Sequence, residues 1–359
     1  LLAKHKNKRL LTLLFNHRVF EFKVDKERVV SCVALDKKNC IEKELIGEHI
    51  VAACGGITGN LDKVKAHWYE PWGEAPNEML NGSHKYADGL IHDALSKQGV
   101  KVTHLDKMWN YAAGIPHPQA QFEHQGLSLI PCKSALWLDH TGKRIGPEPL
   151  VTGFDTNELC RRVSQLEMPY TWQLLNWRIA AKEFAISGSA HNASIRDRKL
   201  LPFFKETLLG NHKLIRQLEQ QSDHFIVAET LPDLVTQMND LNNDQSIKLH
   251  ELERVVKDYD DIINRGKSLW NDDQLRRIQQ ARAWRPDKFR TCKPKAILNK
   301  NSGPLIAIKI RLISRKSLGE IQTNLQSQVL DLSGKPIAGL YAIGEAAGFG
   351  GGGASGFKS

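Results

Sequence analysis

Two glycine-rich segments of the sequence can bring main-chain groups against a ligand. In residues 50–60 (IVAACGGITGN) a short apolar run ends on Gly55 and Gly56. In residues 339–353 (GLYAIGEAAGFGGGG) an apolar run ends on Gly344, and one carboxylate, Glu345, follows directly. Glycine has no Cβ, so backbone N–H groups at such strand ends can approach a flat ring or a pyrophosphate, while the carboxylate accepts hydrogen bonds from hydroxyl groups. Taken alone, either segment could equally be a tight turn after a strand.

The cysteines and histidines give no metal-binding pattern. The six cysteines are scattered and include no C-x-x-C pair, and no histidine stands at zinc-ligand spacing. We therefore predict no metal site and expect reduced, mostly buried thiols, as in a cytoplasmic protein. The cysteines are Cys32, Cys40, Cys54, Cys132, Cys160 and Cys292.

Length and composition indicate an ordinary globular chain. The 359 residues, 41% of them hydrophobic and 25% charged, suggest roughly two domains. The apolar runs at 10–15 and 50–54 are far shorter than the ~20 residues of a membrane span, so we expect no membrane association. The chain starts without Met and stops within a glycine run, and we interpret it as a piece of a longer protein.

Strands and helices alternate in three blocks. Residues 17–57 indicate strands, with Phe20, Phe22 and Val24 on one face and a turn at 36–39. A helix over 86–95, an extended stretch over 100–106, a loop over 114–126 and a strand at 136–138 follow. The block 157–283 is predicted to be helical, notably at 233–241, 250–264 and 273–284, and strands return at 305–312, 328–332 and 339–343. This order predicts an α/β (α+β) fold in which one domain is interrupted by another.

Five ordered motifs carry a resemblance to a known superfamily. They are IVAACGGITGN, KYADGLIHDALSKQGVKV, SALWLDHTGKRIG, SRKSLGEIQTN and GLYAIGEAAGFGGGGASG. In this order they resemble the FAD-dependent fumarate reductase and 3-ketosteroid dehydrogenase superfamily, in particular its branch of FAD-binding dehydrogenases. The resemblance spans about residues 20 to 356. It implies an oxidoreductase that transfers hydride between FAD and a CH–CH or C=C bond next to a carbonyl or carboxylate of a small-molecule substrate.

The resemblance also implies a domain plan and a cofactor site. An incomplete Rossmann-like FAD-binding domain would occupy 1–125 and 298–359, with a largely helical cap or substrate domain at 126–297. The implied cofactor-binding residues are Gly55, Gly56, Gly59, Asn60, Gly319, Gly344, Glu345, Gly350 and Gly351.

Two departures from the family pattern concern that cofactor site. No G-x-G-x-x-G turn, whose helix N-terminus holds the FAD pyrophosphate, precedes residue 50, and the helix that follows the last glycines in the family is absent. We therefore expect this chain alone to bind FAD weakly or not at all and to be inactive. A companion chain is one possible source of the other half of the site.

The resemblance suggests five catalytic candidates. Arg315 and Lys316 stand where relatives have a polar dipeptide near the reacting ring, and two cations there could stabilise charge on a substrate oxygen. Tyr111 could donate a proton, Arg144 lies in a GKR segment near the cap's substrate face, and Lys182 is favoured over its neighbour Glu183. The structural alternative is an exposed basic pair on a strand end for Arg315 and Lys316, a packed aromatic for Tyr111 and a solvated turn for Arg144. Glu320 replaces the second glycine of the family pattern and adds a side chain where backbone normally lies against the flavin.

A non-enzymatic function is the alternative. Eight Lys and Arg residues between 273 and 295, with Trp284 and Phe289 among them, would suit nucleic acid or an acidic partner. Such a run is more often a solvated helix face, so nucleic-acid binding is the less favoured hypothesis.

Overall fold

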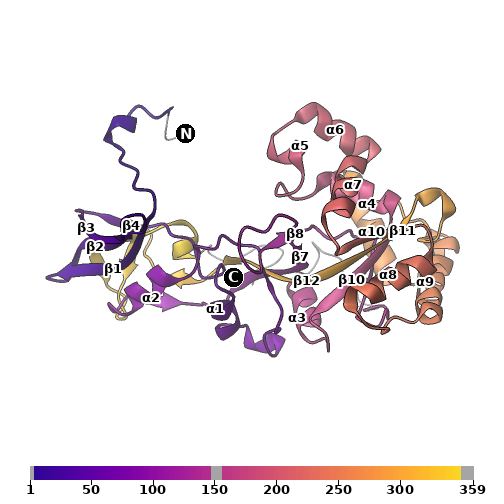
Figure 1. The fold of residues 1–359 in the computed structure, drawn as a ribbon, viewed down its shortest axis with the longest axis horizontal. Coiled ribbons are helices and arrows are strands. Elements are labelled where there is room, and N and C mark those ends of the chain that lie inside the picture. The colour runs from indigo at the N-terminus through magenta and orange to yellow at the C-terminus, as the bar shows by residue number, and fades with distance from the viewer. Residues whose placement is uncertain (1–3, 147–155, 349–359) are drawn as a thin grey trace. The chain divides into compact units, whose positions relative to one another are not determined.

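The computed structural model describes residues 4–146 and 156–348, which form two compact units. Within the described residues, unit 1 comprises 4–57, 86–105 and 317–348, and unit 2 comprises 58–85, 106–146 and 156–316. Both contain sheets and helices, which confirms the predicted mixed α/β class (Figure 1). The domain limits predicted from the resemblance refer to the family's plan and stay a prediction.

Unit 1 is built on one mixed sheet. Its strands are β1 (His17–Asp25), β2 (Arg28–Asp36), β3 (Ile41–Ile46), β4 (Ile50–Ala52), β14 (Gln328–Leu330) and β15 (Pro336–Ala342). The main path runs β1-β2-β15-β14, with β3 paired to β2 and β4 paired to β15. Strand β15 runs parallel to β2 and β4. The other neighbouring pairs, including β14 with β15, are antiparallel. A two-stranded ladder of β6 (Val102–Thr103) and β13 (Glu320–Ile321) lies in the same unit.

The first strand departs from the predicted alternation. Phe22 is buried, whereas Phe20 and Val24 are exposed. Register shifts between Val19 and Glu21 and between Lys23 and Val24 interrupt the pairing of β1 with β2. An extra residue in one strand redirects the side chains that follow it, so Phe20, Phe22 and Val24 do not share one buried face.

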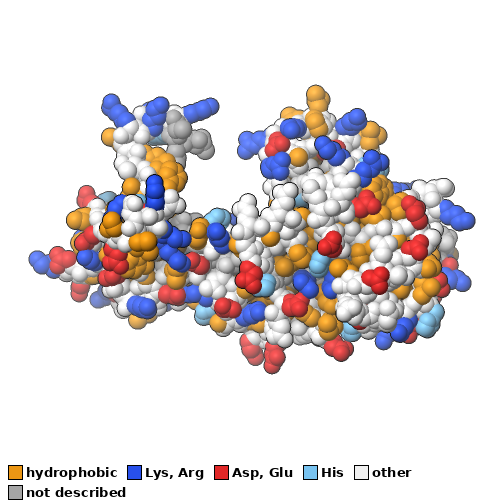
Figure 2. Space-filling view, in the orientation of Figure 1, with side chains coloured by type: hydrophobic (Ala, Val, Ile, Leu, Met, Phe, Trp, Pro, Cys, Tyr) orange, Lys and Arg blue, Asp and Glu red, His pale blue; other side chains and the backbone are white. Residues whose placement is uncertain are grey.

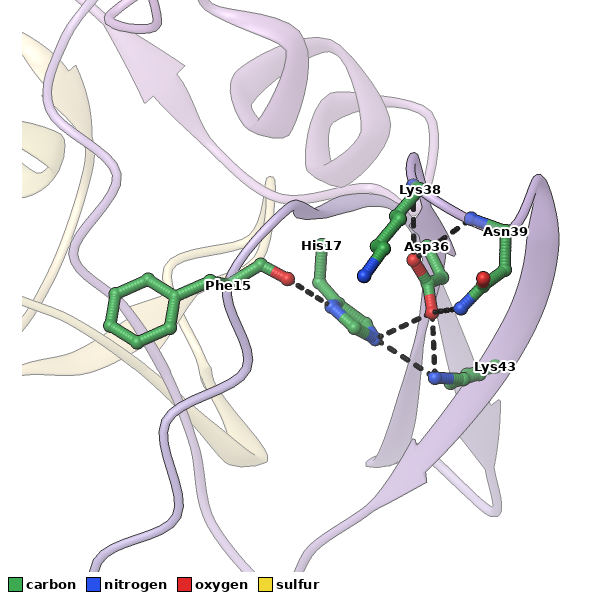
Figure 3. A network of polar contacts seen from close by, with 6 residues as sticks. All are labelled: Phe15, His17, Asp36, Lys38, Asn39 and Lys43. Carbon is green, nitrogen blue, oxygen red and sulfur yellow. Dashed lines mark hydrogen bonds and ion pairs between the residues drawn. The ribbon is translucent and has the colours of Figure 1, made fainter.

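The turn between β2 and β3 is fixed by the carboxylate of Asp36 (Figure 3). It accepts hydrogen bonds from the backbone N–H of Lys38 and Asn39, at 3.1 and 3.3 Å, and from the side-chain amide of Asn39 at 2.9 Å. Lys43 Nζ lies 2.8 Å from the same carboxylate, and His17 Nε2 lies 3.8 Å from it. The bonds from Lys43 and Asn39 hold the pKa of Asp36 well below its ordinary value.

Asp36→Asn should lower the denaturant midpoint of the chain near pH 7, because the carboxylate form is the one these donors stabilise. The folded-state pKa is depressed, so the stabilisation is present above the unfolded pKa of about 3.9 and is lost as pH falls toward the folded pKa. The midpoint difference between the two proteins should therefore shrink below about pH 4. Asp25→Asn, at an exposed position of the same hairpin, is the matched control and should change little. A pH-independent difference would contradict the assignment.

The helix of unit 1 starts later than the sequence predicted. Helix α2 is Leu90–Ser96, because Gly89 has φ +74° and the carboxylate of Asp88 accepts a hydrogen bond from the N–H of Leu90 at 3.2 Å. Its Leu95 packs with Phe22, Val29 and Leu340 in the core of the unit. Gly99 follows with φ +78°, a conformation that favours glycine.

Unit 2 is organised around one long central strand. Strand β12 (Leu305–Ser317) pairs antiparallel with β10 (Tyr170–Asn176) and β11 (Phe225–Ala228), and parallel with β5 (Leu80–Asn81). The sheet path is β8-β7-β12-β10-β9, in which β7 is Met108–Pro116, β8 is Gly126–Ser128 and β9 is Leu136–Leu138. The sequence analysis missed β7 and β10. All residues of β10 are buried, so the alternation that identifies a half-buried strand is absent.

Helices complete unit 2 and make up most of the predicted helical block 157–283, which also contains strands β10 and β11. They are α1 (Leu61–Ala66), α3 (Thr156–Ser164), α4 (Trp177–Glu183), α5 (Ala193–Arg196), α6 (Leu200–Leu209), α7 (His212–Gln221), α8 (Leu231–Asn242), α9 (Leu249–Asn264), α10 (Asp273–Ala283) and α11 (Arg285–Arg290). The core of the unit combines the inner faces of these helices with the sheet, around Trp172, Phe184 and Ile306. No helix within the described residues is long and apolar enough to span a bilayer.

Candidate functional site

Two parallel strands of unit 1 end side by side at the predicted glycines. Ile50, Val51 and Ala52 of β4 pair with Leu340, Tyr341 and Ala342 of β15. Beyond the strands come Gly55, with φ +81°, and Gly344, with φ +67°. Nucleotide cofactors of open α/β sheets bind at the carboxyl ends of parallel strands, so this pair of strand ends is the candidate cofactor site.

Glu345 lies directly beyond β15, in the short 3-10 helix Gly344–Ala347. Its Oε1 accepts a hydrogen bond from the backbone N–H of Ser317 at 3.0 Å. The carboxylate therefore ties the end of β15 to the chain that enters β13. A carboxylate has capacity for further donors, such as the hydroxyl groups of a sugar or ribityl chain.

Gly56 and Gly319 are required by close packing. A Cβ on Gly56 would lie 2.4 Å from Ser317 Oγ and 2.8 Å from Glu320 Oε1, and one on Gly319 would lie 2.1 Å from the carbonyl oxygen of His104. Any larger residue at these positions would force the neighbouring chain to move. This packing requirement exists without a ligand, so the two glycines alone do not identify a cofactor.

Glu320 is buried at the centre of this region. Its Oε2 lies 2.8 Å from Nε2 of buried His92, on α2, and its Oε1 accepts a hydrogen bond from the N–H of Ile57 at 3.2 Å. The hydroxyl of Ser317 accepts from the same N–H at 3.2 Å. The backbone of Glu320 has φ +118°, a region that favours glycine and costs other residues about 1–3 kcal/mol. The strain agrees with the glycine that the resemblance implies at this position.

The residues at the ends of β4 and β15 fit FAD. The surroundings of the Ile57 N–H fit it less well. The main chain of Gly55 and Gly344 and the carboxylate of Glu345 form a polar edge of the kind that holds a dinucleotide. The N–H of Ile57 is instead occupied by Ser317 and Glu320. A flavin contacting that N–H would require these two side chains to turn away. His92 was not found from the sequence, because one histidine on a predicted helix carries no spacing signal.

The other predicted cofactor residues have structural contacts in unit 2. The side-chain oxygen of Asn60 caps α1, accepting from the N–H groups of Asp62 and Lys63 at 3.0 and 3.2 Å. The carbonyl oxygen of Gly59 accepts from the side-chain amide of Asn81 at 2.8 Å. Gly350 and Gly351 lie outside the described residues. Cofactor contacts from these four positions stay a prediction.

Arg315 and Lys316 lie near the end of β12, and both are half-buried. Arg315 Nη1 donates to the carbonyl oxygen of Gly82 at 2.6 Å, which holds the guanidinium against the segment after β5. Tyr111 is half-buried on β7, where the chain pairs within the sheet. The catalytic roles of Arg315, Lys316 and Tyr111 therefore stay predictions.

Arg144 and Lys182 make contacts within unit 2. Arg144 forms an ion pair with Asp272 at 2.6 Å and lies over the ring of Tyr259, which excludes the alternative of a fully solvated turn. Lys182 donates to the carbonyl oxygen of Thr207, and burial lowers its pKa. The neighbouring Glu183 is buried and accepts from the Ser134 hydroxyl at 2.6 Å, so it serves the packing of the unit.

Comparison with known proteins identifies the class. The FAD binding domain family matches residues 1–357, and the chain belongs to this family. It is 34% identical over 329 residues to a KsdD-like steroid dehydrogenase of Mycolicibacterium smegmatis, and 34% identical over 326 residues to one of Mycobacterium tuberculosis, strain H37Rv. These alignments cover 91% and 90% of this chain, but 59% and 57% of the relatives. The chain thus spans less than two thirds of the length of the curated relatives it matches.

Solved structures show the same fold. A 3-ketosteroid Δ1-dehydrogenase of Sterolibacterium denitrificans matches with a TM-score of 0.61 and 16% identity, over 95% of this chain and 56% of that one. A flavocytochrome c3 fumarate reductase matches with a TM-score of 0.57 and 18% identity, over 92% of this chain and 46% of that one. The resemblance found from the five sequence motifs is confirmed, and FAD is the cofactor of the family.

Proposed function

We propose that this chain is part of an FAD-dependent dehydrogenase or reductase that acts on a CH–CH or C=C bond next to a carbonyl or carboxylate. The observation that carries the proposal is the pair of parallel strands ending at Gly55 and Gly344–Glu345, in a chain that belongs to the FAD binding domain family. The steroid dehydrogenases among its relatives favour a ketone as the activating group. When bound, FAD supplies the group that accepts or donates the hydride.

The chain's own residues then have three tasks. Glu345 accepts hydrogen bonds from cofactor hydroxyl groups, and the backbone of Gly55 and Gly344 lets the cofactor approach the sheet. Arg315 and Lys316 hold the substrate's carbonyl or carboxylate oxygen and stabilise the charge that develops on it. Tyr111 is the candidate proton donor for the adjacent carbon or oxygen.

The remaining contacts to the cofactor require a further segment of protein. Among the described residues β4 pairs with β15 alone, and its residues line a pocket of about 570 Å³. The side chain of Val51, in the middle of β4, is 51% exposed there. An added strand would complete the sheet at this edge and could bring the phosphate-binding turn. It would come from the same protein or from a companion chain.

The experiment is anaerobic mixing of the flavin-loaded protein that contains this chain with a saturated 3-ketosteroid and, separately, with succinate. Loss of the oxidised flavin absorbance with the ketosteroid supports a ketone-activated dehydrogenase. Loss of the oxidised flavin absorbance with succinate, or reoxidation of the reduced protein by fumarate, supports an enzyme whose substrate is activated by a carboxylate. Flavin that exchanges electrons with neither class would contradict the proposal.

A further inference from the structure

Helices at one end of unit 2 enclose a basic pocket of about 790 Å³. Its walls come from α4, the end of α6, α10, α11 and the segment just before β12. Figure 1 shows α4, α6 and α10 at the same end of the unit. Lys and Arg side chains are dense over this end of the unit in Figure 2. The described lining contains neither Asp nor Glu and includes six cations: Arg178, Lys182, Arg282, Arg285, Lys288 and Lys293.

Buried hydrogen-bonding groups in the wall lack partners. The side chains of Thr291 and Ser302 are 0% and 2% exposed, and neither hydroxyl has a hydrogen-bond partner among the described residues. The buried Nε of Arg178 also has no hydrogen-bond partner among the described residues. A buried polar group without a partner costs about 1–3 kcal/mol, so native proteins rarely keep three of them in one wall. Thr291, Ser302 and Arg178 all line the pocket, so its wall carries polar groups besides the charged side chains.

The cations are positioned for that ligand. Arg178 and Arg282 donate to the carbonyl oxygens of Lys293 and Thr291, which fixes the two guanidinium groups against the wall. Within the described part of the chain, no ion pair to a carboxylate engages Arg285, Lys288 or Lys293. The Cys292 thiol also lines the pocket, but burial raises its pKa to about 11, so it adds no negative charge near neutral pH.

Aromatic side chains stand at the same pocket. The indole of Trp177 stacks on the ring of His212, with an interplanar angle of 18°, and donates to His212 Nδ1 at 2.8 Å. Phe289, on α11, is 40% exposed. Flat rings beside a cationic wall suit a ligand that joins phosphates to an aromatic base.

The pocket is distinct from the region around Arg315. Ser302 and Gly303 line it immediately before β12 begins at Leu305, while Arg315 lies near the other end of the strand. Ten residue steps along the strand, at about 3.3 Å each, separate Leu305 from Arg315 by about 33 Å. A ligand in the pocket would therefore not touch Arg315 or Lys316.

We propose that this pocket binds a nucleoside diphosphate, with the pyrophosphate on the cations and the base against the aromatic side chains. The test is calorimetric titration of the 359-residue chain with ADP, inorganic pyrophosphate and adenosine. We expect ADP to bind most tightly, pyrophosphate more weakly and adenosine not measurably. The ADP affinity should fall with added salt, because the main contacts are charged.

Variants locate the binding. Arg285→Ala with Lys288→Ala should weaken ADP binding about tenfold or more, because each removes a charged contact to phosphate. Arg254→Ala with Lys257→Ala on the exposed face of α9 removes the same charge and should have no effect. Glu345→Ala should also leave ADP binding unchanged, which separates this pocket from the flavin site.

Three results would overturn the proposal. These are no measurable ADP binding, equal losses in the pocket and α9 variants, or binding of a single-stranded oligonucleotide with no competition by ADP. The last would assign the basic surface to nucleic acid instead.

Discussion

Replacing both Arg315 and Lys316 with alanine should slow flavin reduction or reoxidation by substrate about 10²–10³-fold in the flavin-loaded protein that contains this chain. Both residues are half-buried near the end of β12, and removing their charge removes the stabilisation of a developing oxyanion. FAD content should stay unchanged, because Glu345 and the strand-end glycines are intact. Stopped-flow absorbance of the flavin measures the rate directly.

The control for this experiment must match the loss of charge. Lys213→Ala with Arg216→Ala removes two cations from the exposed face of α7 and should leave the rate within about twofold of the parent, well inside the loss expected at the site. Arg315 also donates to the carbonyl oxygen of Gly82, so the melting temperature should be recorded for each variant. A double variant that keeps its rate and its fold would show that the pair is not part of the substrate site.

Glu345→Ala should weaken FAD binding about 10–100-fold, the range expected for losing hydrogen bonds to a charged group. Glu345→Gln keeps an acceptor oxygen at the same place and should lose less. Both variants are made in the protein that contains this chain. Flavin fluorescence after dialysis against increasing FAD concentrations gives the dissociation constant of FAD for each. Because Glu345 also binds the Ser317 N–H, the Gln variant separates the cofactor contact from the chain contact. Equal affinity in the parent and the Ala variant would remove Glu345 from the cofactor site.

The sequence predicted the strand ends well because their signal is local. An apolar run ending on glycine determines its own geometry, so the ends of β4 and β15 at Gly55 and Gly344 were found from the residues alone. The long helices α8, α9 and α10 were found in the same way, from 3.6-residue periodicity.

Features that depend on distant residues were missed. The pairing of Glu320 with His92 joins positions 228 residues apart (320 minus 92), and no periodicity records it. Strand β10 is buried along its whole length by partners far along the chain, so its pattern did not distinguish it from a buried helix. Arg144 was expected near the substrate, and only the structure shows its pairing with Asp272.

Flavin content tests the central claim most directly, and it should be measured on two proteins side by side. One is the 359-residue chain, and the other is the protein produced from the same reading frame followed in both directions. The account predicts far less than one FAD per molecule in the first, because the phosphate-binding turn is not among these residues, and about one in the second. Near-equimolar FAD in the short chain would contradict the assignment of the phosphate anchor to another segment. A colourless longer protein that takes up no FAD would contradict the proposed function itself.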